Sequence, residues 1–280
     1  MRRFSDSIKI QRYISSLKKQ GKVVGFVPTM GALHEGHLSL LRKARQQSDV
    51  VVLSIFVNPK QFAPNEDLEK YPRNLEHDIE LAEHEGTDIV FCPSGATIYP
   101  EGYSTYVTED YLTRYWCGAS RPDHFRGVTT IVLKLFNIVL PDTAFFGQKD
   151  IQQALVIRKM VTDLNLPVNI CICPIVREPD GLALSSRNVY LNAQERKDAL
   201  VLRKSLEFAQ QAFSQGERRS DVIQAGMRKI ILSAKSASID YIGCADKTTL
   251  APKDILDHGD IVLLAVYIGS TRLIDNCVLS

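Results

Sequence analysis

Short apolar runs rich in β-branched residues recur along the first 176 residues, and helical patterns lie between them. The first run, 23–27, precedes Pro28, which we expect to end the strand because proline cannot donate to a sheet ladder. Further runs lie at 50–57, 87–91, 143–146 and 168–176. Strands that alternate with helices are typical of an α/β fold, here a Rossmann-like parallel sheet with helices on its faces.

Apolar residues three and four positions apart predict the helices between these strands. We expect helices at 5–20, from about 34 through Ala44, and at 75–85, 128–140 and 151–164. The segment 93–123, which carries several tyrosines and the only tryptophan, shows neither period. We expect this segment to run over the surface.

The pattern changes after residue 176. Amphipathic helices are expected at 193–214 and about 220–235, with Asn192 as a candidate helix cap, and strands at 239–244, 261–268 and 272–279. The tight turn at 269–271 would pair the last two strands. Helices followed by antiparallel strands predict a smaller α+β domain, so we expect two domains, 1–176 and 177–280.

Composition is that of an ordinary globular protein, with 45% hydrophobic and 24% charged residues. A net charge of +2 over 280 residues gives no reason to expect nucleic acid as a partner. No apolar run reaches membrane-spanning length, and no signal-peptide core follows Met1, so we expect a cytoplasmic protein. The six cysteines form no CxxC motif and lie mostly in apolar runs, which disfavours a disulfide framework or a zinc site.

Candidate chemistry centres on His34-Glu35-Gly36-His37, shortly after the first strand. If the helix begins near His34, both imidazoles project from one side of its first turn. A strand, a turn containing Gly31 and a helix N-terminus also direct backbone N–H groups at a phosphate. Two histidine donors at this point suit charge that develops on a phosphate oxygen in a transition state. The alternative is that one or both histidines cap the helix or fill space.

Polar residues also follow the second strand. Asn58 and Gln61 lie where ligands collect in open α/β sheets, at the carboxyl end of a strand. The alternative is an Asn-Pro turn with a solvated glutamine. The polar segment 63–74, bracketed by Pro64 and Pro72, is typical of a mobile loop at the rim of a site.

Cationic residues follow later strands. Lys149 at a strand-to-helix turn is a natural point charge for a phosphate, and the 184–187 hydroxyls and guanidinium could clamp a triphosphate. A linker that leads to the helix cap is the alternative for the latter segment. Arg121 and Arg126 could bind phosphate or carboxylate, although surface arginines are commoner.

Six blocks in unbroken order resemble the pantothenate synthetase, or pantoate–β-alanine ligase, family of the HxGH nucleotidyltransferase class. They are PTMGALHEGH, FVNPKQF, YPRNLEHD, RPDHFRG, FGQKD and LALSSRN. The resemblance runs from residue 20 to 195 and continues more loosely to the C-terminus. In its LSSR signature, Arg187 stands where class I aminoacyl-tRNA synthetases use lysine.

This resemblance implies an AMP-forming acid–amino acid ligase of the coenzyme A pathway. ATP and (R)-pantoate would give pantoyl adenylate and pyrophosphate, and the amine of β-alanine would then displace AMP to give pantothenate. Residues 1–176 would be the Rossmann-like ATP- and pantoate-binding catalytic domain, and 177–280 the smaller domain with LSSR at its start. Mg²⁺ would accompany ATP through ligands that the sequence does not reveal. A homodimer is implied, with neither nucleic acid nor membrane as a partner.

The resemblance also assigns residues by position. Catalytic roles fall to His34, His37, Lys149 and Arg187. The implied ATP-binding residues are Met30, Gly31, His34, His37, Gly147, Gln148, Lys149, Asp150, Val176, Leu184, Ser185, Ser186 and Arg187. The implied pantoate- and β-alanine-binding residues are Gln61, Gln153, Asn58 and Tyr71.

Three other functions stay open at this stage. A simple nucleotidyltransferase would share the histidine motif but gives no account of Gln61 and Gln153 together. A tRNA synthetase fragment is disfavoured by the near-neutral charge and by the lack of an anticodon-binding-sized extension. A non-enzymatic nucleotide sensor would bind ATP without exchanging pyrophosphate.

Overall fold

The computed structural model describes residues 1–64, 66 and 68–280, in two compact units. The expected mobile loop at 63–74 includes Asn65 and Asp67, which lie outside the described residues. The first unit comprises Met1–Glu109, Arg121–Gln148 and Gln153–Pro174, and the second comprises Asp110–Ser120, Lys149–Gln152 and Ile175–Ser280. Within the described ranges, no helix has both the length and the apolar content needed to cross a membrane.

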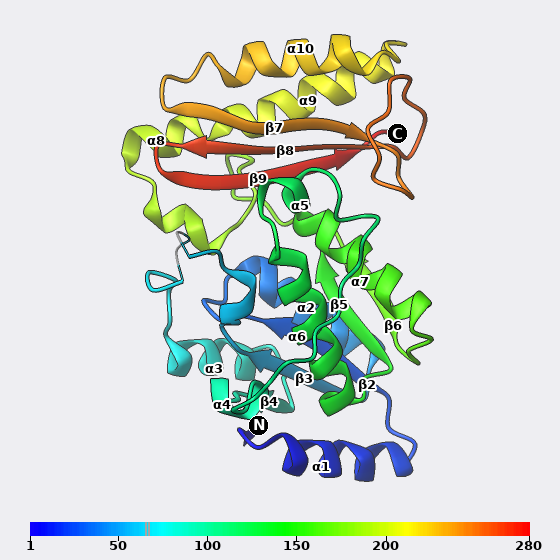
Figure 1. The fold of residues 1–280 in the computed structure, drawn as a ribbon. Helices are drawn as coiled ribbons and strands as arrows, with labels where there is room; N and C mark the ends of the chain where they lie inside the picture. The colour runs from blue at the N-terminus through cyan, green and yellow to red at the C-terminus, as the bar shows by residue number, and fades with distance from the viewer. Residues whose placement is uncertain (65, 67) are drawn as a thin grey trace. The chain divides into compact units, whose positions relative to one another are not determined.

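A six-stranded parallel sheet forms the centre of the first unit, in the order β1-β4-β3-β2-β5-β6 (Figure 1). Its strands are β1 (Arg2–Phe4), β2 (Val24–Thr29), β3 (Val50–Ile55), β4 (Ile89–Phe91), β5 (Thr143–Gly147) and β6 (Asn169–Cys173). The predicted parallel sheet is confirmed, with β1 as an additional strand that the sequence pattern did not reveal. The strand order reverses beside β2, and ligands bind at such points in open α/β sheets.

Pro28 does not end the first predicted strand, because β2 continues through it to Thr29. The backbone N–H and C=O groups of successive residues in a strand point in turn toward its two neighbouring strands. Those of Pro28 point toward the same neighbour as those of Val24. The Val24 carbonyl oxygen accepts from Asp142 N, next to β5, so this neighbour is β5. Pairing with β5 stops at Phe26, whereas pairing with β3 continues to Thr29. The missing N–H of Pro28 therefore falls where no partner strand remains.

Helices cover both faces of this sheet. They are α1 (Ser7–Lys19), α2 (Glu35–Gln47), α3 (Leu75–His84), α4 (Gly95–Ile98), α6 (His124–Val139) and α7 (Ile151–Asp163), with 3₁₀ turns η1 (Pro59–Gln61) and η2 (Gln148–Asp150). On one face, Leu41 of α2 and Ile79 of α3 pack in a core with Val27. On the other, Phe26 meets Phe136 of α6 with ring centroids 6.4 Å apart. Successive residues of β2 thus pack against the helices on opposite faces of the sheet.

The second unit carries an antiparallel sheet of β7 (Ala237–Ala245), β8 (Ile261–Ile268) and β9 (Thr271–Val278). Helices α9 (Leu200–Ser214) and α10 (Ser220–Ile231) cover one face of it (Figure 1), and α5 (Cys117–Ser120) belongs to the same unit. The expected helix at 193–214 is divided at Ala199 into α8 (Ala193–Asp198) and α9. Asn192 caps α8 as predicted, in a capping box with Glu195.

Candidate active site

The two motif histidines lie on the first turn of α2, as the sequence predicts. His34 is the N-cap, and its Nδ1 accepts from Gly36 N at 3.1 Å. His37 Nδ1 accepts from His34 N at 3.3 Å, and the ring centroids are 4.1 Å apart. Because Nδ1 is an acceptor in both rings, Nε2 carries the proton when the imidazoles are neutral. Helix capping therefore occurs, and it fixes both Nε2 atoms as donors.

The turn before these histidines rests on a carboxylate that the sequence analysis did not single out. Asp78 is only 1% exposed, and its two oxygens accept from Ala32 N at 2.9 Å and Leu33 N at 2.7 Å. Gly31 has a φ of +84°, and a Cβ there would lie 2.8 Å from Asp78 Oδ2. Burial raises the pKa of Asp78 above its ordinary range, against the opposing effect of the two N–H donors. Asp78 thus holds the backbone that leads into His34.

A sequence signal for Asp78 does exist. It is one of the three buried residues of α3, with Ile79 and Ala82, so a carboxylate occupies the core-facing side of an amphipathic helix. Buried carboxylates require hydrogen-bond partners, so such a position indicates a fixed structural contact.

Asn58 and Gln61 are brought together at the end of β3. Asn58 caps η1 by accepting from Lys60 N at 3.2 Å, and its Nδ2 donates to Gln61 Oε1 at 3.1 Å. Gln61 Nε2 donates in turn to Met30 Sδ at 2.9 Å. Gln61 and Met30 are half-buried, whereas Asn58 is 1% exposed. An Asn-Pro turn is therefore present, but its glutamine is held by neighbours rather than solvated.

Gln153 lies near the start of α7 and is half-buried. The adjacent Gln152 is buried, and its amide bonds to Cys117 N and to the carbonyl oxygens of Leu112 and Tyr115 at 2.9 to 3.0 Å. Those bonds belong to the second unit and give Gln152 a structural role. No described contact links Gln153 with Gln61.

The loop after η1 meets the start of α6 through ionic and aromatic contacts. Arg121 Nε donates to Glu66 Oε1 at 2.6 Å, and His124 Nδ1 donates to the Gln61 carbonyl oxygen at 2.8 Å. Burial opposes ionisation of Glu66, but the hydrogen bonds and charge of Arg121 outweigh it and hold the pKa of Glu66 below its usual range. Arg126 lies over the Tyr106 ring at 3.9 Å. Of the two candidate arginine forks, Arg121 thus binds a carboxylate of this chain.

Tyr71, near the end of the same loop, is 6% exposed, and its ring lies edge-on to Phe62 with centroids 6.0 Å apart. This residue is therefore packed inside the first unit, close in sequence to the site residues 58 and 61.

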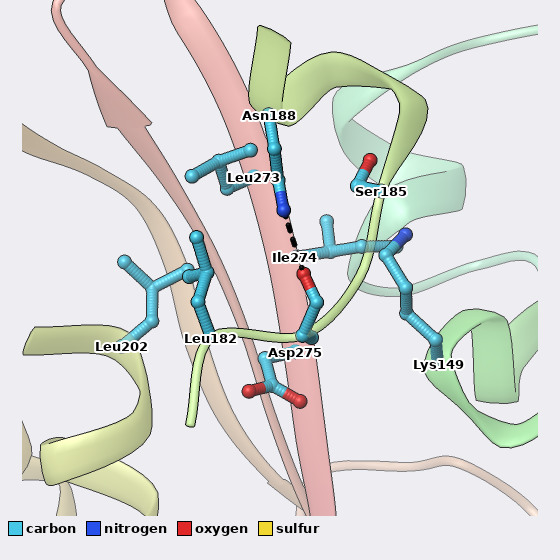
Figure 2. Close-up of a pocket in the computed structure, with 9 residues that line it drawn as sticks. Lys149, Leu182, Ser185, Asn188, Leu202, Leu273, Ile274 and Asp275 are labelled. Atoms are coloured by element: carbon cyan, nitrogen blue, oxygen red, sulfur yellow. Dashed lines mark hydrogen bonds between the residues drawn. The ribbon is translucent and has the colours of Figure 1, made fainter. Parts of the chain in front are cut away.

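Lys149 lines a small pocket in the second unit. Lys149, Ser185, Asn188 and Asp275 contribute polar groups to its lining (Figure 2). Lys149 Nζ lies 3.6 Å from Asp150 Oδ2, and the Lys149 carbonyl oxygen accepts from Asn276 Nδ2 at 3.0 Å. Arg177 makes a two-point contact with the buried Asp275 at 2.7 and 3.0 Å. These bonds fix the backbone on both sides of the pocket.

The LSSR segment is a tight turn within this unit. Leu184 N donates to the Val176 carbonyl oxygen at 3.1 Å, which brings the two ends of the 176–184 turn together. Ser185 caps η3 (Ser186–Tyr190) by accepting from Arg187 N at 3.2 Å. Asn188 donates to the Ala183 carbonyl oxygen at 3.2 Å, the bond dashed in Figure 2. The predicted cap at Asn192 and the predicted hydroxyl-rich turn are therefore both present.

The remaining predicted residues lie at the end of β5. Gly147 is the last residue of that strand, and Gln148, Lys149 and Asp150 form η2, all half-buried. A Cβ at Gly147 would meet no atom within 4 Å, so the surface at this strand end is open. Among the residues that the structure describes, no cluster of three or more histidine, cysteine or acidic side chains is arranged to hold a metal ion.

Known proteins are similar in sequence to this chain over nearly its whole length. The sequence model of the pantoate-beta-alanine ligase family matches residues 2–278. A pantothenate synthetase from Moorella thermoacetica is 54% identical over 96% of this chain and 95% of its own length. A pantothenate synthetase from Geobacter sulfurreducens is 51% identical over 99% of this chain and 98% of its own length.

Solved structures agree with these relatives. Pantothenate synthetase from Thermus thermophilus matches with a TM-score of 0.94 at 42% identity, over 99% of each chain. Pantoate-beta-alanine ligase from Francisella tularensis, solved in complex with beta-gamma ATP and beta-alanine, matches with a TM-score of 0.81 at 35% identity over 99% and 97%. Agreement in sequence and in fold over nearly every residue leads to one conclusion: the chain belongs to the pantoate–β-alanine ligase family.

Proposed function

We propose that this chain carries out its family's reaction with the residues that the sequence analysis assigned. The family joins pantoate to β-alanine at the expense of ATP. Pantoate oxygen attacks the α-phosphorus of ATP to give pantoyl adenylate and pyrophosphate. The β-alanine amine then attacks the acyl carbon, and pantothenate and AMP leave. The observation that carries the proposal is the pair of Nε2 donors fixed on the first turn of α2.

His34 and His37 would bind the phosphates. Negative charge grows on oxygens around the α-phosphorus during attack, and Nε2–H donors held in advance stabilise it without reorganising. The N-terminus of α2 adds its own partial positive charge at the same place. Asp78 contributes by fixing the turn that positions His34.

Lys149 and Arg187 would supply the cationic charge on the phosphates, as a point charge and a planar fork respectively. The wider ATP site would include residues at strand ends and in the LSSR turn. They are Met30, Gly31, Gly147, Gln148, Asp150, Val176, Leu184, Ser185 and Ser186, with Asp150 near the ribose and Val176 near adenine. The open surface at Gly147 is compatible with a nucleotide against the backbone.

Gln61 and Gln153 would hold the hydroxyls and carboxylate of pantoate. Asn58, which is 1% exposed, would lie beside them without touching the substrate. Tyr71 would help to receive β-alanine. Because Tyr71 is 6% exposed and packs on Phe62, that role requires the 63–74 loop to rearrange when the amine enters. Closure of the same loop after the first step would keep water from the acyl adenylate.

Mg²⁺ would arrive with ATP as part of the substrate, since it commonly coordinates phosphate oxygens and retains several waters. We further propose a catalytic domain of residues 1–176 and a smaller domain of residues 177–280 that supplies the LSSR turn. A cytoplasmic homodimer is the proposed state of the enzyme, in keeping with its biosynthetic family.

Pyrophosphate exchange tests the first step directly. Labelled pyrophosphate should enter ATP when pantoate is present, and β-alanine should not be required. Exchange that proceeds without pantoate would indicate a different acceptor. Absence of exchange, together with measurable ATP binding, would favour a nucleotide sensor instead.

A further inference from the structure

The Asn58 side chain has a hydrogen-bond partner for every position that its amide offers. Its Nδ2 donates to the Gly127 carbonyl oxygen and to Gln61 Oε1, both at 3.1 Å. Its Oδ1 accepts from Lys60 N at 3.2 Å and from Tyr99 Oη at 2.8 Å. Two N–H donors and two lone pairs are the full capacity of an amide. Since Asn58 is also only 1% exposed, it has neither surface nor spare capacity for a substrate.

These bonds have a fixed direction. A backbone N–H can only donate, so Lys60 N identifies the oxygen of Asn58, and a carbonyl can only accept, so Gly127 O identifies its nitrogen. Asn58 therefore presents an N–H to Gln61 and requires the oxygen of Gln61 to face it. The opposite end of Gln61, its NH₂ group, then points away from Asn58 and reaches Met30 Sδ. A thioether is a weak acceptor, which a carboxylate or hydroxyl oxygen displaces readily.

The Tyr99 hydroxyl also fixes the orientation of the Asn58 amide, because it donates to Asn58 Oδ1. Burial, with smaller contributions from Tyr103 and Tyr106, raises the pKa of Tyr99 far above its usual value, so the hydroxyl stays protonated and remains a donor. The ring packs against Tyr103 at 5.0 Å between centroids and against Phe56 at 6.3 Å. The Tyr99 hydroxyl is thus held rigidly against Asn58 Oδ1.

The packing of η1 on α6 keeps the network in place. A Cβ at Gly127 would lie 2.2 Å from the Lys60 carbonyl oxygen, so only glycine permits this close approach. The same approach places the Gly127 carbonyl oxygen within reach of Asn58.

We propose that Tyr99 and Asn58 are positioning residues that fix Gln61 as a hydrogen-bond donor toward the acid substrate. The inference rests on the proposed role of Gln61 in holding pantoate. It adds a specificity rule: the site accepts an acid that offers an acceptor oxygen at Gln61, and it discriminates against one that offers only a hydrogen or methyl group there. Asn58 acts through Gln61 rather than by touching the substrate.

The test is Tyr99→Phe, which keeps the ring and removes the hydroxyl. In pyrophosphate exchange, we expect the pantoate KM to rise about 5- to 10-fold, since one orienting hydrogen bond is lost, while the ATP KM changes less than about twofold. Tyr103→Phe is the matched control, because the described residues include no hydrogen bond from its hydroxyl and its ring contacts Tyr99. This control should leave both constants unchanged.

A double-variant cycle separates orientation from general damage. In a Gln61→Ala background, Tyr99→Phe should change the pantoate KM by less than about twofold, because there is no amide left to orient. An equal rise in both backgrounds would overturn the inference, as would an unchanged pantoate KM in Tyr99→Phe or equal rises for ATP and pantoate. If the parent enzyme exchanges pyrophosphate without pantoate, the proposed function fails as well. Pantoate-dependent exchange in the parent with an unaffected Tyr99→Phe would overturn this inference alone.

Discussion

Asp78 offers the sharpest test of how the phosphate-binding turn is built. Asp78→Asn keeps the size of the side chain but replaces one oxygen by an NH₂ group. In the parent protein, the backbone N–H groups of Ala32 and Leu33 each donate to a separate oxygen of Asp78, at 2.9 and 2.7 Å. With asparagine only one of them can be satisfied, and the other faces a donor. The substitution therefore removes one hydrogen bond and leaves a buried N–H without a partner.

The magnitude follows from that arrangement. An unsatisfied buried donor costs about 1–3 kcal/mol, and Asp78 is 1% exposed, so water cannot easily replace the lost oxygen. We expect Asp78→Asn to lower the free energy of unfolding by about 1–3 kcal/mol. Asp78→Ala, which leaves both N–H groups without partners, should cost about twice as much. Glu80→Gln, an exposed charge removal on the same helix α3, should stay within about 0.5 kcal/mol of the parent.

Urea unfolding followed by circular dichroism measures these differences, and pyrophosphate exchange measures their effect on chemistry. Because the 31–33 turn leads directly into the His34 cap, Asp78→Asn should slow exchange at saturating ATP more than it weakens ATP binding. If Asp78→Asn unfolds at the same urea concentration as Glu80→Gln and exchanges pyrophosphate at the parent rate, the carboxylate does not hold the turn and the reasoning fails.

Four further predictions address separate parts of the site. His37→Ala should raise the barrier to adenylate formation by about 2.7–4 kcal/mol in single-turnover experiments while changing ATP affinity less, and equal loss of affinity with unchanged chemistry would contradict its role. Gln153→Ala should weaken pantoate binding in calorimetry with nearly normal ATP binding, and the reverse pattern would exchange the two assignments. Because Arg121 depresses the pKa of Glu66, the stability that this carboxylate adds is present above its unfolded value of 4.5 and is lost as pH falls through the lower folded pKa. The unfolding free energy of the parent relative to Glu66→Gln should thus be constant near neutrality and shrink only in acid, and a difference that does not vary with pH would refute the ion pair. Gly127→Ala should cost about 1–3 kcal/mol and raise the pantoate KM, because its Cβ would meet the Lys60 carbonyl; Gly95→Ala, where a Cβ meets nothing within 4 Å, is the control.

The strands and helices with a regular apolar pattern could be predicted, because residues that become buried recur at fixed spacing along the sequence. The apolar runs of β2 to β6 and the amphipathic helices are signals of many residues each. β1 has only three residues, RRF, two of which are exposed, so no apolar run marks it. Pro28 shows a different limit. Whether a proline ends a strand depends on which neighbour its N–H would face, and that is a property of the sheet rather than of the strand.

Contacts between residues far apart in the sequence explain why Asp78 and Tyr99 were not predicted as part of the site. Asp78 lies 45 residues from Leu33, and Tyr99 lies 41 residues from Asn58. Local pattern contains no register between such segments, although a carboxylate on the buried side of α3 was visible in it. Asn58, Gln61 and residues 147–150 were easier to find, because they follow strand ends, where ligands collect in open α/β sheets.

His34 and His37 were expected either to cap the helix or to bind phosphate, and the first role does not count against the second. In a capping histidine, Nδ1 accepts a hydrogen bond from a backbone N–H, and this is so for both rings here. An imidazole without this bond exchanges its proton between the two nitrogens and presents an acceptor to a phosphate part of the time. With Nδ1 engaged, the neutral ring has a single tautomer, and Nε2 is always a donor. The cap therefore removes the state that would repel a phosphate oxygen. The spacing of the HEGH motif makes this possible, since residue 37 reaches back to the N-cap backbone only from the third position of the helix.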